Sequence, residues 1–301
     1  MKSLGIDVGA TTIKGGIVSD GKIVRYYKVP TDTENGAEGI LRSLYTVIER
    51  LIGYADADSA VGISSTGDID PVEGKVIYAT DVMPEYSGVD IKKLVESRTG
   101  RSAFIANDCV SALIGEMRYG AGKGCRDAVM LTLGTGLGFA ACADGKIVMG
   151  SHYRAGRFGH VLLYKDGRRC PCGRQGCNEA YVSATGLMRT AHKHGLMIAD
   201  CNELAQYKDT QAFRETIDEF TDDFAAVIWN VTAIFDPEAI VIGGGLVLLR
   251  DLWWDELAKK VPDPQVLRAA QLGNGSGIIG ATLLEDPEIS KNWKEAEYEA
   301  V

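Results

Sequence analysis

Apolar residues at the start of the chain fall in short runs separated by glycine, threonine or aspartate, which is the pattern of buried strands joined by tight turns. The runs predict three strands, at residues 3–8, 13–19 and 22–29. The dipeptide Asp20-Gly21 between the second and third strands is typical of a two-residue hairpin turn. The chain is therefore expected to begin with three strands joined by tight turns.

Longer stretches have the three- and four-residue spacing of amphipathic helices. They predict helices at about residues 37–53, 90–97, 110–119, 179–194 and 210–235. Short apolar runs predict further buried strands at residues 60–64, 103–106 and 238–242. Glycines at 273–277 open a last buried helix, and the charged tail at 286–301 is expected to form a surface helix. The mixture of elements is typical of an α/β fold.

The first hairpins recur later in the chain. Residues 126–150 resemble residues 2–26, and the motif DGKIV at residues 20–24 recurs unchanged 124 positions later. An internal duplication explains this better than the chance similarity of two hairpins, and it predicts two similar α/β halves. The copies differ at a position of chemical interest, because Asp7 in the first corresponds to Leu131 in the second.

Each copy offers a hairpin of glycine and threonine after a strand. Backbone N–H groups and hydroxyls in two such hairpins can bind a polyphosphate. Asp7 is a candidate to hold Mg²⁺, through water, against the phosphates; the alternative is that it satisfies amides of the turn. A further glycine run, Gly243-Gly244-Gly245, follows a strand and precedes a helix, which suits close approach of a nucleotide but is weak on its own.

Three cysteines lie close together, at Cys170, Cys172 and Cys177, and His160 lies ten positions before the first of them. Thiolates and an imidazole at this spacing can close around one zinc ion, and four protein ligands would make that zinc structural. The alternatives are a disulfide with a spare cysteine, or buried free thiols. The chain has seven cysteines, an odd number, and we see no signal peptide, so we favour the metal.

Bulk composition limits the classes of function. The 301 residues suit two domains, and a net charge of −9 argues against a general nucleic-acid binder, which needs a basic face. No apolar run approaches the length that crosses a membrane. The N-terminal residues enter a strand pattern at once, so we expect no targeting segment and a cytoplasmic protein.

Together, these motifs resemble those of the ROK family of bacterial sugar kinases and repressors over nearly the whole chain. Two phosphate motifs, an adenosine-side motif and a zinc motif carry the resemblance, at residues 7–12, 134–138, 240–245 and 170–179. The resemblance implies an α/β fold of two duplicated actin/hexokinase (ribonuclease H-like) domains with a cleft between them and a zinc-bound loop at residues 160–179. We place the smaller domain at residues 1–107 plus about 284–301, and the larger at 108–283.

Family members transfer the ATP γ-phosphoryl group to a sugar hydroxyl, usually O6, with the aspartate of an Asn-Asp pair as base. The matching pair is Asn107-Asp108, so the resemblance implies that Asp108 accepts the hydroxyl proton. By the same resemblance Asn107, His160 and Glu179 contact the sugar, and His160 also binds zinc.

The resemblance further implies the cofactors ATP, Mg²⁺ and structural Zn²⁺, a small-molecule sugar as partner, and a homodimer; neither nucleic acid nor membrane is expected. The residues expected to contact the nucleotide belong to the glycine-bearing motifs and the strands beside them: Asp7, Gly9, Thr11, Thr12, Lys14, Gly134, Thr135, Gly136, Gly138, Gly243, Gly244 and Gly245. The expected zinc ligands are His160, Cys170, Cys172 and Cys177.

The expected sugar pocket departs from the family pattern. Arg157 stands where the family usually has a glutamate, Asp81 where it has an asparagine, and Thr66-Gly67 where it has Pro-Gly. Arginine offers only donors and has the opposite charge. We hypothesise that the sugar is not plain glucose, and that Arg157 pairs with Asp81 or Glu179 or receives an anionic group of the sugar. The alternative is that Arg157 points to solvent.

Two other functions stay open from the sequence. Repressors of the family carry a helix-turn-helix before the first phosphate motif, which begins here at residue 7, so we do not expect one. A sugar- or nucleotide-binding regulatory protein without kinase activity is the stronger alternative. The altered sugar pocket favours it, whereas the presence of Asp108 and of all glycine motifs counts against it.

Overall fold

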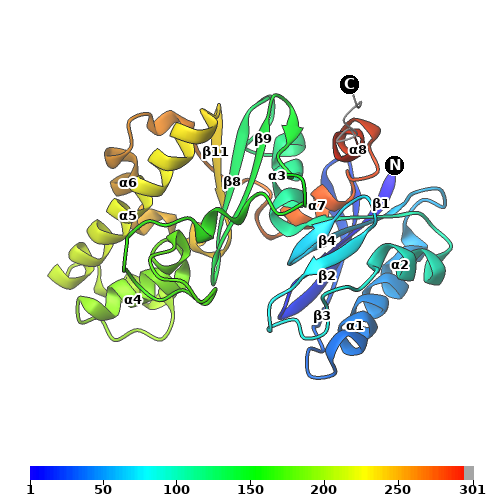
Figure 1. Ribbon diagram of the computed structural model, residues 1–301, viewed down its shortest axis with the longest axis horizontal. Coiled ribbons are helices and arrows are strands. Elements are labelled where there is room, and N and C mark those ends of the chain that lie inside the picture. Colours follow the sequence, from blue (N-terminus) through cyan, green and yellow to red (C-terminus); the bar gives the residue numbers. More distant parts are fainter. Residues whose placement is uncertain (295–301) are drawn as a thin grey trace. The chain divides into compact units, whose positions relative to one another are not determined.

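The computed structural model describes residues 1–294, and in it the chain forms two compact units (Figure 1). The first unit contains Met1–Gly124, Lys146–Ala155 and the described residues from Asn274 onward, and the second contains Cys125–Gly145 and Gly156–Gly273. The units divide at other residues than the expected borders at 107 and 284. Residues 295–301, which belong to the expected small domain and tail helix, lie outside the described residues.

The first unit is built around a mixed five-stranded sheet of the order β3-β2-β1-β4-β7. Its strands are β1 (Lys2–Val8), β2 (Thr12–Ser19), β3 (Lys22–Pro30), β4 (Val61–Ser65) and β7 (Ala103–Asn107). β1 pairs antiparallel with β2 and parallel with β4, so the predicted hairpins continue into a parallel half-sheet. A separate hairpin follows β4 and has no counterpart in the sequence-based expectations; its strands are β5 (Asp68–Asp70) and β6 (Lys75–Tyr78).

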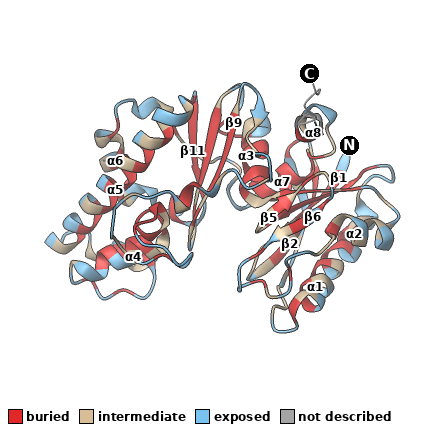
Figure 2. Cartoon of the chain, in the orientation of Figure 1, coloured by how far each residue is buried: buried red, intermediate tan, exposed pale blue. Residues whose placement is uncertain are grey.

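Helices cover both faces of this sheet. They are α1 (Gly36–Leu51), α2 (Ile91–Thr99), α3 (Asp108–Tyr119) and α7 (Ser276–Ala281), with a short 3₁₀ turn after α1 at Ile52–Tyr54; the unit also contains α8 (Pro287–Lys294). Leu4 and Ile6 of β1 are fully buried in one apolar core with residues of α1. Gly5 between them faces α7, where a Cβ would lie 2.1 Å from the carbonyl oxygen of Ile278. The alternation of β1 therefore packs a different helix on each face (Figure 2).

The position of α3 explains why the first unit extends beyond residue 107. α3 packs tightly on α7: a Cβ at Gly115 would lie 2.7 Å from the carbonyl oxygen of Ser276. Both helices therefore belong to the first unit. In α8, the last described helix, Trp293 is buried, so this part of the charged tail packs on the protein with one side. No helix within residues 1–294 is long and apolar enough to span a membrane.

The second sheet repeats the topology of the first, in the order β10-β9-β8-β11-β12. Its strands are β8 (Ala128–Leu133), β9 (Leu137–Ala143), β10 (Lys146–Ile147), β11 (Ala239–Gly243) and β12 (Leu267–Ala269). β8 pairs antiparallel with β9 and parallel with β11, as β1 does with β2 and β4. Both Asp-Gly turns are left-handed, with φ of 49° at Asp20 and 53° at Asp144. The predicted duplication and the mixed α/β fold class are confirmed.

The duplicated hairpins differ by one residue at the turn. Residues 9–12 join the last paired residues of β1 and β2, whereas only residues 134–136 join those of β8 and β9. Counted from the turn, Asp7 corresponds to Thr132, and both are half-buried. The equivalence of Asp7 with Leu131 is therefore wrong, because Leu131 is fully buried on the other face of its strand. The second copy still has no carboxylate at this position.

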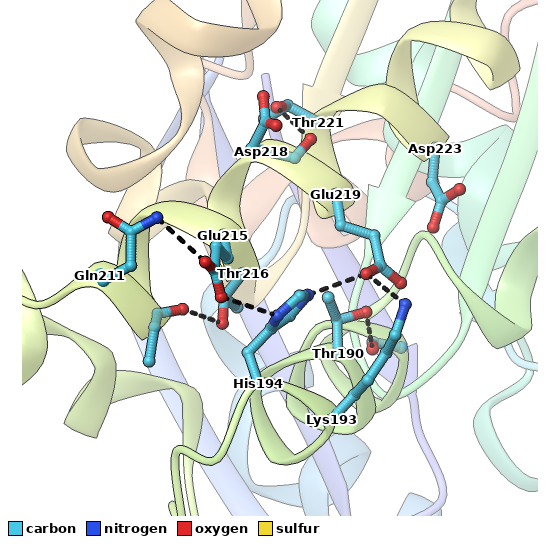
Figure 3. A network of polar contacts seen from close by, with 12 residues as sticks. Thr190, Lys193, His194, Gln211, Glu215, Thr216, Asp218, Glu219, Thr221 and Asp223 are labelled. Carbon is cyan, nitrogen blue, oxygen red and sulfur yellow. Dashed lines mark hydrogen bonds and ion pairs between the residues drawn. The ribbon is translucent and has the colours of Figure 1, made fainter.

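Besides β8, β9, β11 and β12, the second unit contains three helices, α4 (Ala184–Lys193), α5 (Gln211–Phe235) and α6 (Trp254–Lys260). It also contains the short 3₁₀ segments η2 (Arg157–His160), η3 (Asn178–Ala180), η4 (Cys201–Tyr207), η5 (Gly245–Leu252) and η6 (Pro264–Val266). The expectation of one helix over 179–194 is wrong. The chain turns after η3, and α4 starts anew because the Ser183 hydroxyl accepts the N–H of Gly186 (3.0 Å). Lys193 and His194 at the end of α4 bind Glu219 of α5, at 2.6 and 2.8 Å (Figure 3).

Candidate active site

The Asn107-Asp108 pair lies where β7 ends and α3 begins. The Asn107 side chain caps the helix, because its Oδ1 accepts the backbone N–H groups of Cys109 (2.9 Å) and Val110 (3.3 Å). Its Nδ2 donates to the carbonyl oxygen of Gly67 (2.9 Å) in the loop after β4. The structure thus brings together Asn107 and Gly67, two of the residues expected to contact a sugar.

Asp108 is the first residue of α3 and keeps partial access to solvent. Its Oδ1 accepts the backbone N–H of Cys109 (2.8 Å). Burial, followed by the negative charge of Asp7, raises the pKa of Asp108 from 3.8 to about 6. A carboxyl group with this pKa is ionised at neutral pH and still takes up a proton readily, as a general base must.

Asp7 near the end of β1 lies opposite Lys14 of β2. Its Oδ2 is 2.9 Å from Nζ of Lys14, and its Oδ1 accepts the hydroxyl of Ser64 on β4 (2.8 Å). Lys14 also donates to the carbonyl oxygen of Asn274 (3.2 Å). The partners of the carboxylate in these contacts are side chains, which argues against the alternative that Asp7 serves the turn amides. Both side chains remain partly exposed, Lys14 by 24% and Asp7 by 17%, so a ligand can reach them.

The turn after β1 is closed by backbone hydrogen bonds. The N–H of Gly9 donates to the carbonyl oxygen of Thr12 (3.2 Å). Thr31, just after β3, braces the turn: its hydroxyl donates to the carbonyl oxygen of Gly9 (2.7 Å) and its N–H to that of Thr11 (3.0 Å). Thr11 is exposed and Thr12 half-buried. The turn therefore presents polar groups to solvent close to Asp7.

The turn after β8 is held partly by residues from elsewhere in the second unit. The N–H of Gly134 donates to the carbonyl oxygen of Gly136 (3.0 Å). Two donors at the start of α4 bind the carbonyl oxygens of Gly134 and Thr135, both at 2.9 Å. The N–H of Leu137, where β9 begins, donates to Oε2 of Glu179 (3.1 Å). Glu179, expected to contact a sugar, is thus placed on the second phosphate motif.

The glycine run at 243–245 lies beside this second turn. Gly244 has a left-handed φ of 85°, and a Cβ there would lie 2.5 Å from the carbonyl oxygen of Leu133 at the end of β8. Only glycine suits both the conformation and the space. Around Gly245 a Cβ would meet no atom within 4 Å, so the start of η5 has open space beside it. Gly138, the last residue of the expected second motif, lies within β9.

The four expected zinc ligands meet at one point. The ligand atoms of His160, Cys170, Cys172 and Cys177 all lie within 4.8 Å of one another. Sγ of Cys172 is 3.6 Å from Sγ of Cys177, and Sγ of Cys170 is 3.7 Å from Nδ1 of His160. A tetrahedral zinc site with Zn–S bonds of about 2.3 Å has edges of about 3.8 Å, so the cluster fits this ion. The cysteines are all free, which argues against the disulfide alternative.

Polar contacts to α5 fix the loop that carries this cluster. The Tyr164 hydroxyl donates to Oδ1 of Asp223 (2.7 Å), which is buried on α5. The Arg168 guanidinium lies 3.1 Å from Glu219 of α5 and 4.5 Å from the ring centre of Tyr181. Sequence reasoning does not anticipate these contacts, because an arginine in a loop of glycines and cysteines is usually a solvated charge. The loop is therefore held by α5 as well as by the ligand cluster.

Two of the residues that depart from the family pattern, Arg157 and Asp81, lie on the surface. Arg157 begins η2, three positions before His160, and is exposed; Asp81 is exposed in the loop after β6. Arg157 belongs to the second unit and Asp81 to the first. Glu179, the other expected partner of Arg157, has one carboxylate oxygen on the N–H of Leu137. His160 and Glu179 are brought together by the ligand cluster, since Oε1 of Glu179 lies 3.7 Å from Sγ of Cys170.

These features define an α/β protein with two copies of one sheet topology, a glycine-threonine turn in each copy, and a cluster of one histidine and three cysteines. Residues 3–287 match the ROK family, and the chain belongs to that family.

Relatives of known activity match along almost the whole length. The chain is 32% identical to the glucokinase of Thermotoga maritima, with 93% of this chain and 96% of that protein aligned. The crystal structure of a ROK family glucokinase from Streptomyces griseus in complex with glucose and AMPPNP has a TM-score of 0.80 at 29% identity, covering 94% of this chain and 99% of that one. The ROK hexokinase from Thermus thermophilus has a TM-score of 0.81 at 28% identity, covering 94% and 97%.

Proposed function

We propose that the protein is an ATP-dependent sugar kinase that transfers the γ-phosphoryl group of ATP to a hydroxyl of a hexose or hexose derivative, at O6. The observation that carries this proposal is the position of Asp108, a partly accessible carboxyl group at the start of α3, directly after Asn107, which caps that helix; its raised pKa, about 6, suits a base. The similarity to glucokinases over nearly the whole chain supports a sugar as the acceptor.

In this mechanism the Asp108 carboxylate accepts the proton of the sugar hydroxyl as its oxygen attacks the γ-phosphorus. A bond forms between that oxygen and the phosphorus, and the bond to the β–γ bridging oxygen breaks, so that ADP leaves. The proton stays on Asp108 until it is released to solvent. Backbone N–H groups of the turns at 9–12 and 134–138 bind phosphate oxygens, and the glycine run at 243–245 leaves room for the nucleoside.

The residues present fit both implied metals. Carboxylate oxygens are the ligands that Mg²⁺ prefers, and the Asp7 side chain is accessible, so Asp7 would hold Mg²⁺ through water. The ion would neutralise charge on the phosphates. The cluster of His160 and three cysteines would hold Zn²⁺ with four protein ligands and no open position, so this zinc stabilises the loop and takes no part in the reaction.

The sugar contacts that we propose are Asn107, Gly67, Asp81, His160, Glu179 and Arg157. Asn107 uses one Nδ2 hydrogen on Gly67, and the second can donate to a sugar hydroxyl. Nδ1 is the nitrogen of His160 that lies in the ligand cluster, so Nε2 serves the sugar. Zinc binding thereby fixes the orientation of a sugar-contacting ring.

The proposal is tested by measuring ADP release from ATP-Mg²⁺ over a panel of hexoses, amino sugars, N-acetyl sugars and sugar acids, with Asp108→Asn as the comparison. We expect at least one sugar to stimulate ADP release in the wild-type protein and not in the variant. If no sugar raises ADP release above that of the variant, the kinase assignment is wrong and the regulatory binding protein becomes the better account.

A further inference from the structure

The Glu179 carboxylate occupies a backbone N–H group of the second glycine-threonine turn. Its Oε2 accepts the N–H of Leu137 at 3.1 Å. The contact requires a glycine beside it, because a Cβ at Gly136 would lie 2.3 Å from the same oxygen. The other oxygen, Oε1, lies 3.7 Å from Sγ of Cys170. All these groups belong to the second unit.

The corresponding turn of the first unit is arranged differently. Both turns are closed by the N–H of their first glycine, Gly9 or Gly134, but in the first turn the nearby carboxylate, Asp7, faces the ammonium group of Lys14 at 2.9 Å. Backbone amides in turns of this kind bind anions. In the second turn the protein therefore places its own anion on an amide that belongs to a phosphate motif.

We propose that Glu179 is a switch that couples sugar binding to nucleotide binding. Without sugar, its carboxylate holds the N–H of Leu137, and its negative charge repels an incoming phosphate. With sugar, the carboxylate accepts hydrogen bonds from sugar hydroxyls, and the N–H of Leu137 becomes available to a phosphate oxygen of ATP. A ligand shifts such an equilibrium only if it binds the two states differently, and the sugar hydroxyls supply that difference. This inference rests on the proposed function and adds that the sugar binds before ATP.

Only the side chain of Glu179 has to move. Its backbone is fixed: the N–H of Ala180 donates to the carbonyl oxygen of Cys177 (3.0 Å), and the Ser183 hydroxyl donates to that of Glu179 (2.7 Å). The Arg168 guanidinium also donates to the carbonyl oxygen of Ala180 (3.4 Å). The Glu179 side chain is half-buried, so it is open to a ligand. A change of rotamer on a fixed turn is enough to release Leu137.

In a kinase, this switch would suppress the hydrolysis of ATP by water. Water competes with the sugar as phosphoryl acceptor whenever ATP is bound in a reactive position. If the second turn binds phosphate fully only after the sugar has drawn Glu179 away, hydrolysis of ATP without sugar is suppressed.

The test is calorimetric titration of AMPPNP-Mg²⁺ into wild-type protein and Glu179→Ala, each with and without the sugar that gives the highest rate of ADP release. In the wild type we expect the sugar to tighten nucleotide binding about tenfold, a common size for coupling between sites. Without sugar, we expect Glu179→Ala to bind AMPPNP about tenfold more tightly than the wild type, and sugar to add nothing further. If Glu179→Ala without sugar binds AMPPNP no more tightly than the wild type, the switch is overturned.

Two further variants secure the result. Glu203→Ala is the matched control, because Glu203 is a half-buried glutamate of the same unit whose Oε1 accepts one backbone N–H, that of Ala199 (3.3 Å). We expect no change in nucleotide affinity from it. Metal content is measured in every variant; if Glu179→Ala has lost zinc, zinc-loaded Glu179→Gln replaces it, and unchanged AMPPNP affinity in that variant overturns the proposal.

The nucleotide arm of the experiment uses no sugar. It therefore decides on the competition between Glu179 and phosphate even if no sugar in the panel is phosphorylated, which is the outcome that contradicts the proposed function.

Discussion

The two glycine-threonine turns belong to the two copies of the duplicated hairpin, but the charged side chains beside them differ. In the first unit Asp7 and Lys14 lie on adjacent strands of the hairpin itself, 2.9 Å apart. In the second, the carboxylate comes from Glu179, 42 residues beyond Leu137 in the chain. The first turn thus has a permanent charge pair suited to metal and phosphate. The second has a removable charge, carried by a side chain on the turn that follows Cys177.

The largest expected effect concerns the unit with the permanent charges. We expect Asp108→Asn to lower kcat by about 10²–10⁴-fold, the contribution of a general base, with little change in nucleotide affinity. The measurement is steady-state ADP release with the best sugar of the panel. Asp90→Asn is the matched control, because Asp90 also starts a helix of this unit and accepts the N–H of Lys93 (3.0 Å). Equal kcat values for the two variants would show that Asp108 is not the base.

The next effect concerns the loop of the second unit that carries the ligand cluster. We expect Cys172→Ser to weaken zinc binding by at least about 100-fold, since loss of an outer-shell partner alone costs 10–100-fold. Sugar affinity should fall with it, because His160 and Glu179 lose their fixed positions. Zinc content by atomic absorption and sugar titrations measure both. Cys125→Ser, which lies outside the cluster, is the control. If zinc-free Cys172→Ser binds sugar as tightly as the wild type, the metal is not needed for sugar binding.

A smaller effect is expected from the charge pair of the first turn. Lys14→Met removes the cation that faces Asp7, and we expect AMPPNP affinity to fall about tenfold, or ~1.4 kcal/mol. The reason is that a ligand phosphate then meets Asp7 without its counter-charge. Titration of AMPPNP measures this, with Lys22→Met, an exposed lysine at the other end of the same sheet, as control. Identical affinities for the two variants would mean that Lys14 has no part in nucleotide binding.

The smallest expected effect is a change in the relative preference for different sugars. Arg157→Glu restores a carboxylate near the ligand cluster, and we expect neutral hexoses to gain a few-fold relative to sugar acids, because the charge at the pocket reverses. The readout is the ratio of kcat/KM values over the sugar panel. A ratio unchanged from the wild type would leave Arg157 as a solvated side chain.

Much of the fold could be predicted because its signals are local. The strands around Asp20-Gly21 and Asp144-Gly145 follow from apolar runs and hairpin turns, and the duplication follows from their repetition. The helix expected at 179–194 is wrong because the apolar pattern does not reveal where Ser183 starts a new helix. The equivalence of Asp7 with Leu131 is wrong because a turn that is one residue shorter cannot be recognised from the pattern of residue types alone.

In the candidate site, too, local signals could be predicted from the sequence and contacts that depend on packing could not. The four members of the ligand cluster could be found from sequence, because metal ligands have characteristic types and spacing. The contact of Glu179 with Leu137 could not, because a hydrogen bond to a backbone N–H depends on no particular residue type at the donor. The anchoring of the loop by Arg168 and Glu219 likewise joins residues 51 positions apart, and only the packing of α4 on α5 brings them together.

The most direct test of the account is the pH dependence of kcat/KM for the sugar in the wild type and in Asp7→Asn. Burial and the charge of Asp7 raise the pKa of Asp108 in the ligand-free protein to about 6, and the base works only when ionised. Because kcat/KM reports the free enzyme, we expect it to rise with pH to a plateau, with a midpoint near 6, and the midpoint to move to lower pH in Asp7→Asn. A profile that is flat between about pH 5 and 8 would contradict Asp108 as the base. So would a midpoint that is the same in Asp7→Asn as in the wild type.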